Sequence, residues 1–269
     1  MDILPLSGTA SSSRRTGSSA CLLFYSPGLC FHCPGARLVE TRWLKLLSNQ
    51  ARIGVVIQPI ASIENHGVLP LGADLLIADC AMSRLELPEE VVIAPTIPYS
   101  TAAEHAGFRV SISPQTFVQY LVEVGLSILS SNNALLFAVF HGGAYHATYL
   151  AARILRSKGY EVYLFNFWDT VTRALGLEDA LIHADCIEAS ILLACGYTQG
   201  VREAERIDSS CIHRAPPYQP WVSRDVPGIY PGDPVPASRP LGEKLLQTAT
   251  EQLRGLVGLI LERQKASSQ

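Results

Sequence analysis

The chain has 269 residues, of which 48% are hydrophobic and 17% are charged, and this length is enough to build one domain with a sizeable core. The formal net charge of −3, without a run of basic residues interleaved with aromatic ones, excludes a general affinity for nucleic acid. The longest apolar runs, such as residues 134–140, are too short to cross a bilayer, so we predict no contact with a membrane.

The first 35 residues differ in composition from the rest of the chain. Residues 11–19 are rich in serine, arginine and glycine, and the apolar stretch that follows them is short. We therefore predict a weakly ordered N-terminal extension over residues 1–35 and a single domain over residues 36–269.

Strand and helix patterns alternate along this domain. Strands are predicted at residues 53–60, 91–94, 135–140 and 161–165. Helices are predicted at residues 39–47, 74–85, 114–129, 144–157, 187–194 and 241–263, and residues 206–240 are predicted as loop. This alternation predicts a single three-layer α/β domain, in which helices flank a mainly parallel sheet.

Seven cysteines are scattered along the chain without regular spacing, which does not indicate a disulfide framework. Cys80 and Cys195 lie in apolar helical stretches and are predicted to be small core residues. A reducing compartment follows from this interpretation, so the protein is predicted to be cytoplasmic.

Ligand-type side chains follow the first predicted strand, in the segment from Glu64 to Asp74. Glu64 and His66 are two residues apart, so an extended backbone points both side chains to the same side. Glycine and proline residues then turn the chain and bring Asp74 back towards them. Carboxylate oxygen and imidazole nitrogen together suit zinc, manganese or iron.

Two further motifs carry ligand-type residues. His141-Gly142-Gly143 follows the strand at 135–140, and His183 precedes Glu188 near the start of the helix at 187–194. Considered alone, His141 could be a ligand or an incidental residue in a tight strand-to-helix turn. Glu188 could likewise be a ligand or a carboxylate that interacts favourably with the helix dipole. Because the carboxyl ends of parallel strands share one edge, we predict that the three motifs form one metal site, with His183 as a proton shuttle.

Together these motifs resemble those of the creatininase family of metal-dependent amidohydrolases. The matching segments span residues 36–263 in the right order. They are Glu64-Asn65-His66-Gly67, Leu69-Pro70-Leu71-Gly72-Ala73-Asp74, His141-Gly142-Gly143, His183-Ala184 with Glu188 and Ser190, Gly232-Asp233-Pro234, and Gly242-Glu243 before the terminal helix.

The resemblance implies a creatininase-like fold, usually assembled as a homohexamer, with two divalent metal ions per subunit. By position, Asp74 would bridge the two ions, Glu64 and His141 would complete one ion's ligands, and His66 would complete the other's. Glu188 matches a family glutamate at or beside the metals, and His183 matches the catalytic histidine. Trp168 corresponds loosely to a tryptophan of the substrate pocket.

The sequence also departs from the family pattern. Asp74 stands ten positions after Glu64, where most family members have eleven. Gly143 stands where creatininase itself has a glutamate ligand, and Ala144 replaces the usual asparagine. These changes preserve metal-type residues and alter substrate contacts, so creatinine is not the predicted substrate.

The predicted function is hydrolysis of a non-peptide C–N bond in a small molecule, such as an amide, a cyclic amide or a formamide. A metal-activated water would attack the carbonyl, and His183 would pass a proton to the leaving nitrogen. Two alternatives stay open: a metallopeptidase that trims a small peptide, and a non-catalytic, metal-stabilised oligomeric protein.

Overall fold

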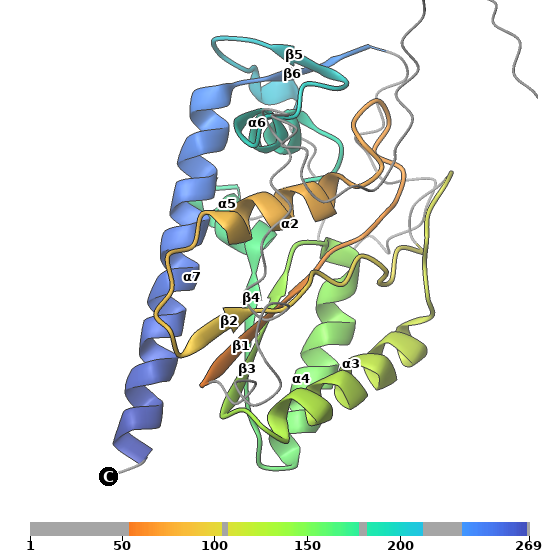
Figure 1. The fold of residues 1–269 in the computed structure, drawn as a ribbon. Helices are drawn as coiled ribbons and strands as arrows, with labels where there is room; N and C mark the ends of the chain where they lie inside the picture. The colour runs from red at the N-terminus through yellow and green to blue at the C-terminus, as the bar shows by residue number, and fades with distance from the viewer. Residues whose placement is uncertain (1–53, 104–106, 178–181, 212–232, 268–269) are drawn as a thin grey trace, which may run out of the picture. The chain divides into compact units, whose positions relative to one another are not determined.

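A computed structural model of the chain describes residues 54–103, 107–177, 182–211 and 233–267 (Figure 1). The chain divides into units of residues 1–33 and 34–269, and all of the described residues belong to the second unit. The predicted extension at 1–35 and the predicted helix at 39–47 lie outside the described residues. Within the described part, no helix is both long and apolar enough to cross a membrane.

Four parallel strands form the central sheet, in the order β2-β1-β3-β4. Their bounds are Val55–Ile60 (β1), Val91–Ile93 (β2), Ala134–Val139 (β3) and Glu161–Asn166 (β4). Every residue of β1 and β3 is buried, because helices cover both faces of the sheet, and this is why both strands read as continuous apolar runs. The four predicted strands are confirmed, with boundaries shifted by one or two residues.

The register of the two central strands positions everything that follows. Val55 pairs with Ala134 and Ile60 pairs with Val139, so β1 and β3 end side by side. The chain therefore leaves both strands at the same edge of the sheet, where ligand sites gather in parallel α/β proteins.

Helices pack on both faces of this sheet, which confirms the three-layer α/β fold (Figure 1). Helices α3 and α4 cover one face, whereas α2, α5, α6 and α7 pack on the other. Their bounds are Ala73–Ser83 (α2), Pro114–Leu129 (α3), Tyr145–Ser157 (α4), Phe167–Leu175 (α5), Cys186–Ala194 (α6) and Arg239–Ser267 (α7).

Helix α5 and the strands β5 (Val201–Glu203) and β6 (Val235–Ala237) have no counterpart in the prediction. Helix α5 follows β4 directly, and β5 and β6 form a small parallel pair. The predicted loop at 206–240 therefore contains β6 and the start of α7. Three-residue strands are too short for a period of two to be recognised, so only the pairing of distant segments defines them.

Helix α6 is held firmly in the layer, with all nine of its residues buried. Arg84 and Arg239 each donate a hydrogen bond to a carbonyl group of its last two residues, at 2.9 and 2.6 Å. These cations complement the negative end of the helix dipole. A Cβ atom on Gly242 would come within 1.9 Å of the carbonyl oxygen of Ser190, so α7 begins in close contact with α6.

Two disulfides correct the interpretation of the cysteines. Cys80 of α2 is bonded to Cys195 at the end of α6, and Cys186 at the start of α6 is bonded to Cys211. The prediction that the cysteines form no disulfides, with Cys80 and Cys195 as plain core residues, is wrong. Packing of α2 against α6 brings those two Cα atoms to 5.8 Å across 115 residues of sequence. The cytoplasmic assignment loses this support and stays a prediction.

The Cys80–Cys195 bond is expected to stabilise the fold by about 2–4 kcal/mol, because it closes a long loop in the unfolded chain. The double variant Cys80→Ala/Cys195→Ala should show that loss in guanidinium unfolding under oxidising conditions. With reductant present, the gap to wild type should narrow, since wild type then loses the same bond. Equal midpoints under oxidising conditions would contradict the expectation.

Candidate metal centre

The loop after β1 folds back on itself and delivers its ligand-type residues to one place. The N–H group of Glu64 donates to the carbonyl of Leu71 (2.9 Å), and that of Leu69 donates to the carbonyl of His66 (3.0 Å). These bonds close the loop. Asp74 consequently falls in the first turn of α2.

The structure brings together all six residues singled out from the sequence as ligands or proton shuttle. All six residues are buried, each with 5% or less of its surface exposed: Glu64, His66, Asp74, His141, His183 and Glu188. Three carboxylates removed from water in one cluster are costly unless cations balance them. The burial and the donor set therefore both fit divalent metal ions.

Two of the three groups of possible ligand atoms share Asp74, and the atoms of each group lie within 4.8 Å of one another. In the first group, His141 Nδ1 lies 3.0 Å from Asp74 Oδ2 and 3.2 Å from Glu64 Oε1. In the second, His66 Nε2 lies 3.3 Å from Glu188 Oε1 and 4.0 Å from Asp74 Oδ1. The two oxygens of Asp74 thus face different groups. Mixed nitrogen and oxygen donors of this kind suit zinc, manganese or iron.

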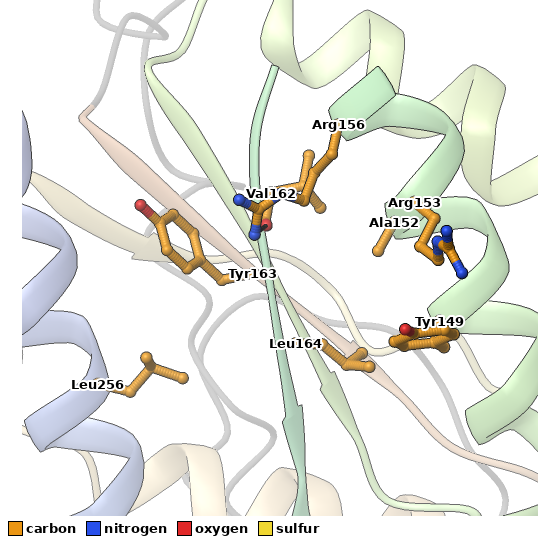
Figure 2. A pocket seen from close by; sticks show the side chains of 8 residues that line it. All are labelled: Tyr149, Ala152, Arg153, Arg156, Val162, Tyr163, Leu164 and Leu256. Carbon is orange, nitrogen blue, oxygen red and sulfur yellow. Dashed lines mark hydrogen bonds between the residues drawn. The ribbon is translucent and has the colours of Figure 1, made fainter. Parts of the chain in front are cut away.

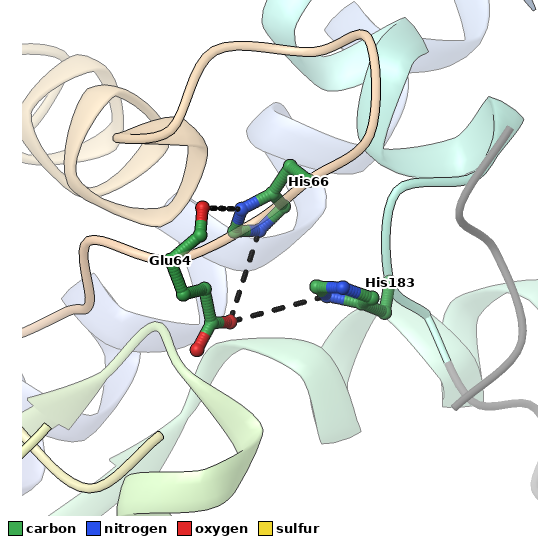
Figure 3. Close-up of side chains that lie close together, drawn as sticks. All are labelled: Glu64, His66 and His183. Atoms are coloured by element: carbon green, nitrogen blue, oxygen red, sulfur yellow. Dashed lines mark hydrogen bonds and ion pairs between the residues drawn. The ribbon is translucent and has the colours of Figure 1, made fainter. Parts of the chain in front are cut away.

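His183 lies in the segment before α6, and its side chain points towards Glu64 and His66 (Figure 3). Its ring centroid lies 4.6 Å from that of His66, and its Nδ1 atom lies 3.9 Å from Glu64 Oε1. Glu64, His66 and His183 also form a group of possible ligand atoms. The geometry is therefore compatible with His183 either contacting a metal ion or exchanging a proton beside it.

All three imidazoles are oriented by backbone carbonyl groups. The pairs are His66 Nδ1 with Glu64 O (3.0 Å), His141 Nε2 with Thr101 O (2.8 Å), and His183 Nε2 with Asn65 O (3.1 Å). Because a carbonyl oxygen only accepts, the ring nitrogen in each pair carries the proton. The other nitrogen of each ring then faces the carboxylates, which is the arrangement that outer partners impose on metal-binding histidines.

The turn between His183 and Glu188 has an unusual backbone. Ala184 has a φ of 50°, in the left-handed region that residues with a side chain rarely adopt. In this conformation its N–H group donates to Glu188 Oε2 at 2.5 Å. Asp185 then caps α6 by accepting from the N–H groups of Ile187 and Glu188. The strained residue thus lies beside the cluster, and its hydrogen bond fixes the direction of the Glu188 carboxylate.

Burial and neighbouring charges shift the pKa values of the cluster in opposite directions. Burial by itself lowers the pKa of His66, but the charge and hydrogen bond of Glu188, together with Asp74 and Glu64, raise it to about 10. The pKa of His141 is likewise raised, by Glu64 and Asp74 against the effect of burial. Burial raises the pKa of Glu64, whereas hydrogen bonding to His141 lowers that of Asp74. Without metal, protons on His66 and His141 therefore balance part of the negative charge of the carboxylates.

Trp168 contacts the backbone next to the cluster. Its side chain is buried, and its indole N–H donates to the carbonyl oxygen of Phe140 at 2.6 Å. This bond holds Phe140, the residue between the end of β3 and His141. The supporting groups at Thr101, Asn65 and Ala184 were not identified from the sequence, because they act through backbone atoms that every residue carries.

A cavity of about 270 Å³ lies elsewhere, across the outer edge of β4 (Figure 2). Its walls come from α4, β4 and α7, and include Tyr149, Arg153, Arg156, Tyr163, Leu164 and Leu256. None of the six cluster residues lines it. The predicted chemistry therefore belongs to the strand ends and not to this cavity.

An α/β domain with a buried carboxylate–imidazole cluster at the carboxyl ends of its parallel strands has the architecture of a metal-dependent hydrolase. The model of the creatininase family, described as creatinine amidohydrolase, matches residues 39–257. The chain belongs to the creatininase family.

Individual proteins are similar to this chain over part of its length or at low sequence identity. The mycofactocin precursor peptide peptidase of Mycolicibacterium smegmatis is 31% identical over 150 residues, which cover 52% of this chain and 58% of that relative. A crystal structure of creatininase aligns with a TM-score of 0.55 at 19% identity, over 83% of this chain and 98% of its own. A creatininase structure named for manganese aligns with a TM-score of 0.54 at 18% identity, over 81% and 95%. Both structures show the shared fold.

The strained turn gives a direct test of the local geometry. Ala184→Gly should raise the free energy of unfolding of the metal-free protein by up to about 1 kcal/mol, because glycine adopts a positive φ without strain. Ala189→Gly, in the interior of α6, is the matched control and should lower it. Chemical unfolding of both variants is the measurement, and a destabilised Ala184→Gly protein would contradict the backbone conformation.

The raised pKa of His66 predicts that metal binding releases protons. Its value of about 10 means that the metal-free protein holds this proton at neutral pH, so a cation must displace it. Metal affinity should therefore rise with pH between 6 and 9, by about tenfold per pH unit for each proton released. Calorimetry in buffers of different ionisation enthalpy measures that number directly, and a value of zero at pH 7 would contradict the charge balance.

Proposed function

We propose that this enzyme hydrolyses the C–N bond of an amide with two divalent cations held by the buried cluster. The observation that carries the proposal is the position of Asp74, whose two carboxylate oxygens face separate groups of donor atoms. A carboxylate placed in this way is suited to bridge two cations. The proposal assigns the catalytic domain to residues 36–269.

Each group supplies three protein ligands. Glu64, His141 and Asp74 would hold one cation, and His66, Glu188 and Asp74 would hold the other. Zinc, manganese and iron all suit these donors, and the creatininase structure named for manganese favours that metal. When bound, such ions polarise a carbonyl group and lower the pKa of water to near neutrality.

His183 is the proposed proton carrier. Its Nε2–H group is engaged by the carbonyl of Asn65, so Nδ1 is the atom that accepts a proton on the side of the cluster. An imidazole that accepts a proton at this atom can then deliver it to the leaving nitrogen. Glu188 is proposed to act with it, because its carboxylate is fixed by Ala184 and faces His66.

The first candidate substrate is a small non-peptide amide, a cyclic amide or a formamide. Gly143 and Ala144 stand where creatininase has a glutamate ligand and where the family usually has an asparagine, so the contacts beside His141 differ from those that suit creatinine. The family description as an amidohydrolase supports a small molecule as the substrate.

The second candidate is a peptide. It is favoured by the named peptide peptidase, which is more similar in sequence than the aligned creatininases, although the match covers 58% of that relative. Both candidate substrates would react at the same cluster, and they differ in the size and chemistry of the molecule that binds beside it. Assembly as a homo-oligomer, a hexamer by family resemblance, and a cytoplasmic location complete the proposal.

Metal analysis tests the binuclear site. Wild-type protein purified without chelator should contain close to two equivalents of metal per chain, and Asp74→Ala should lose most of both, because each cation loses a ligand. Near-zero metal in wild type under metal-replete conditions would refute the proposal.

Turnover tests the role of His183. His183→Ala should keep its metal and lose about 10²–10⁴-fold in turnover number, the usual contribution of a positioned acid or base. His146→Ala, an exposed histidine on α4, is the control and should retain both properties. A panel of cyclic amides, formamides and short peptides then separates the two substrate classes. Full turnover in His183→Ala would remove it from the mechanism.

A further inference from the structure

Ser62 contacts the cluster but belongs to none of the motifs discussed above. It lies between β1 and Glu64, its side chain is fully buried, and its hydroxyl donates to Asp74 Oδ2 at 2.8 Å. Within the described part of the chain, the other side chains paired with this carboxylate are the two imidazoles of His66 and His141. Ser62 is therefore the one neutral side chain seen to hold Asp74.

The hydrogen bond from Ser62 restrains rotation about the last side-chain bond of Asp74, and this rotation sets the directions of its two carboxylate oxygens. Rotation of an aspartate carboxylate about its last side-chain bond is broad, so its rotamer alone does not fix where the two oxygens point. The hydroxyl of Ser62 fixes Oδ2 on the side of His141, at 3.0 Å from Nδ1, and thereby turns Oδ1 towards His66.

We propose that Ser62 is a positioning residue, which keeps the two oxygens of Asp74 divided between the two cation positions. This inference rests on the proposed function, in which Asp74 bridges the cations. A serine hydroxyl suits this task because it keeps its donor at every pH at which the cluster exchanges protons for metal. Outer partners of this kind usually contribute 10–100-fold to metal affinity.

Ser100 provides a matched control at the same edge of the sheet. It is also fully buried, and its hydroxyl donates to the carbonyl oxygen of Ala61 at 2.8 Å, one residue before Ser62. Its side chain makes no hydrogen bond to a cluster residue in the described part of the chain. Ser100→Ala therefore removes an equivalent buried hydrogen bond without touching Asp74.

The experiment compares stepwise binding of Mn²⁺ and of Zn²⁺ to chelator-treated wild type, Ser62→Ala and Ser100→Ala by calorimetry, with the melting temperature of each metal-free protein. We expect Ser62→Ala to bind at least one equivalent about 10–100-fold more weakly, and Ser100→Ala to bind like wild type. The two metal-free variants should melt at similar temperatures.

The outcomes separate the inference from the proposed function. Unchanged affinities in Ser62→Ala, with normal binding of two cations by wild type, would overturn the inference alone. A metal-free Ser62→Ala protein that melts well below Ser100→Ala, or fails to fold, would assign Ser62 a structural role and also overturn it. Wild-type protein that binds fewer than two cations would overturn the proposed function and, with it, the inference.

Discussion

Parallel pairing of β1 with β3 in register is the constraint on which the site depends. Because the two strands end side by side, the loop that carries Glu64 and the turn that carries His141 leave the sheet together. Nδ1 of His141 then lies 3.2 Å from Glu64 Oε1, although 77 positions separate the two residues. A shift of one residue between these buried strands would turn every side chain to the opposite face, so the apolar pattern of the strands also protects the geometry of the cluster.

Electrostatics links the cluster to the cations that we propose it binds. Three buried carboxylates lie against three imidazoles, and without metal His66 and His141 balance part of the negative charge by holding protons. In the proposed function, divalent cations would replace those protons with a larger positive charge, and the imidazoles would then act as ligands. We expect the low exposure of the buried carboxylates to favour the binding of cations, because an unbalanced buried charge is costly.

The two helices that deliver carboxylates are joined to each other. Helix α2 carries Asp74, helix α6 carries Glu188, and the Cys80–Cys195 bond links them directly. The second disulfide anchors the first residue of α6, two positions before Glu188. Ligands on rigid elements keep their distances when a substrate binds, which is the usual requirement for a preorganised site.

The sequence by itself determined the order of the elements and the residue types of the site. Long periodic segments such as 114–129 predicted their helices to the residue, because burial of one face imposes a period that the sequence displays. The predicted ligands Glu64, His66, Asp74, His141 and Glu188 converge because each follows a strand or begins a helix at one edge of the sheet. Only the tertiary structure decided which cysteines pair, how each imidazole is turned, and that Ser62 and the backbone of Ala184 hold the carboxylates. Those features depend on contacts between distant segments and on backbone atoms common to all residues, so no local pattern records them.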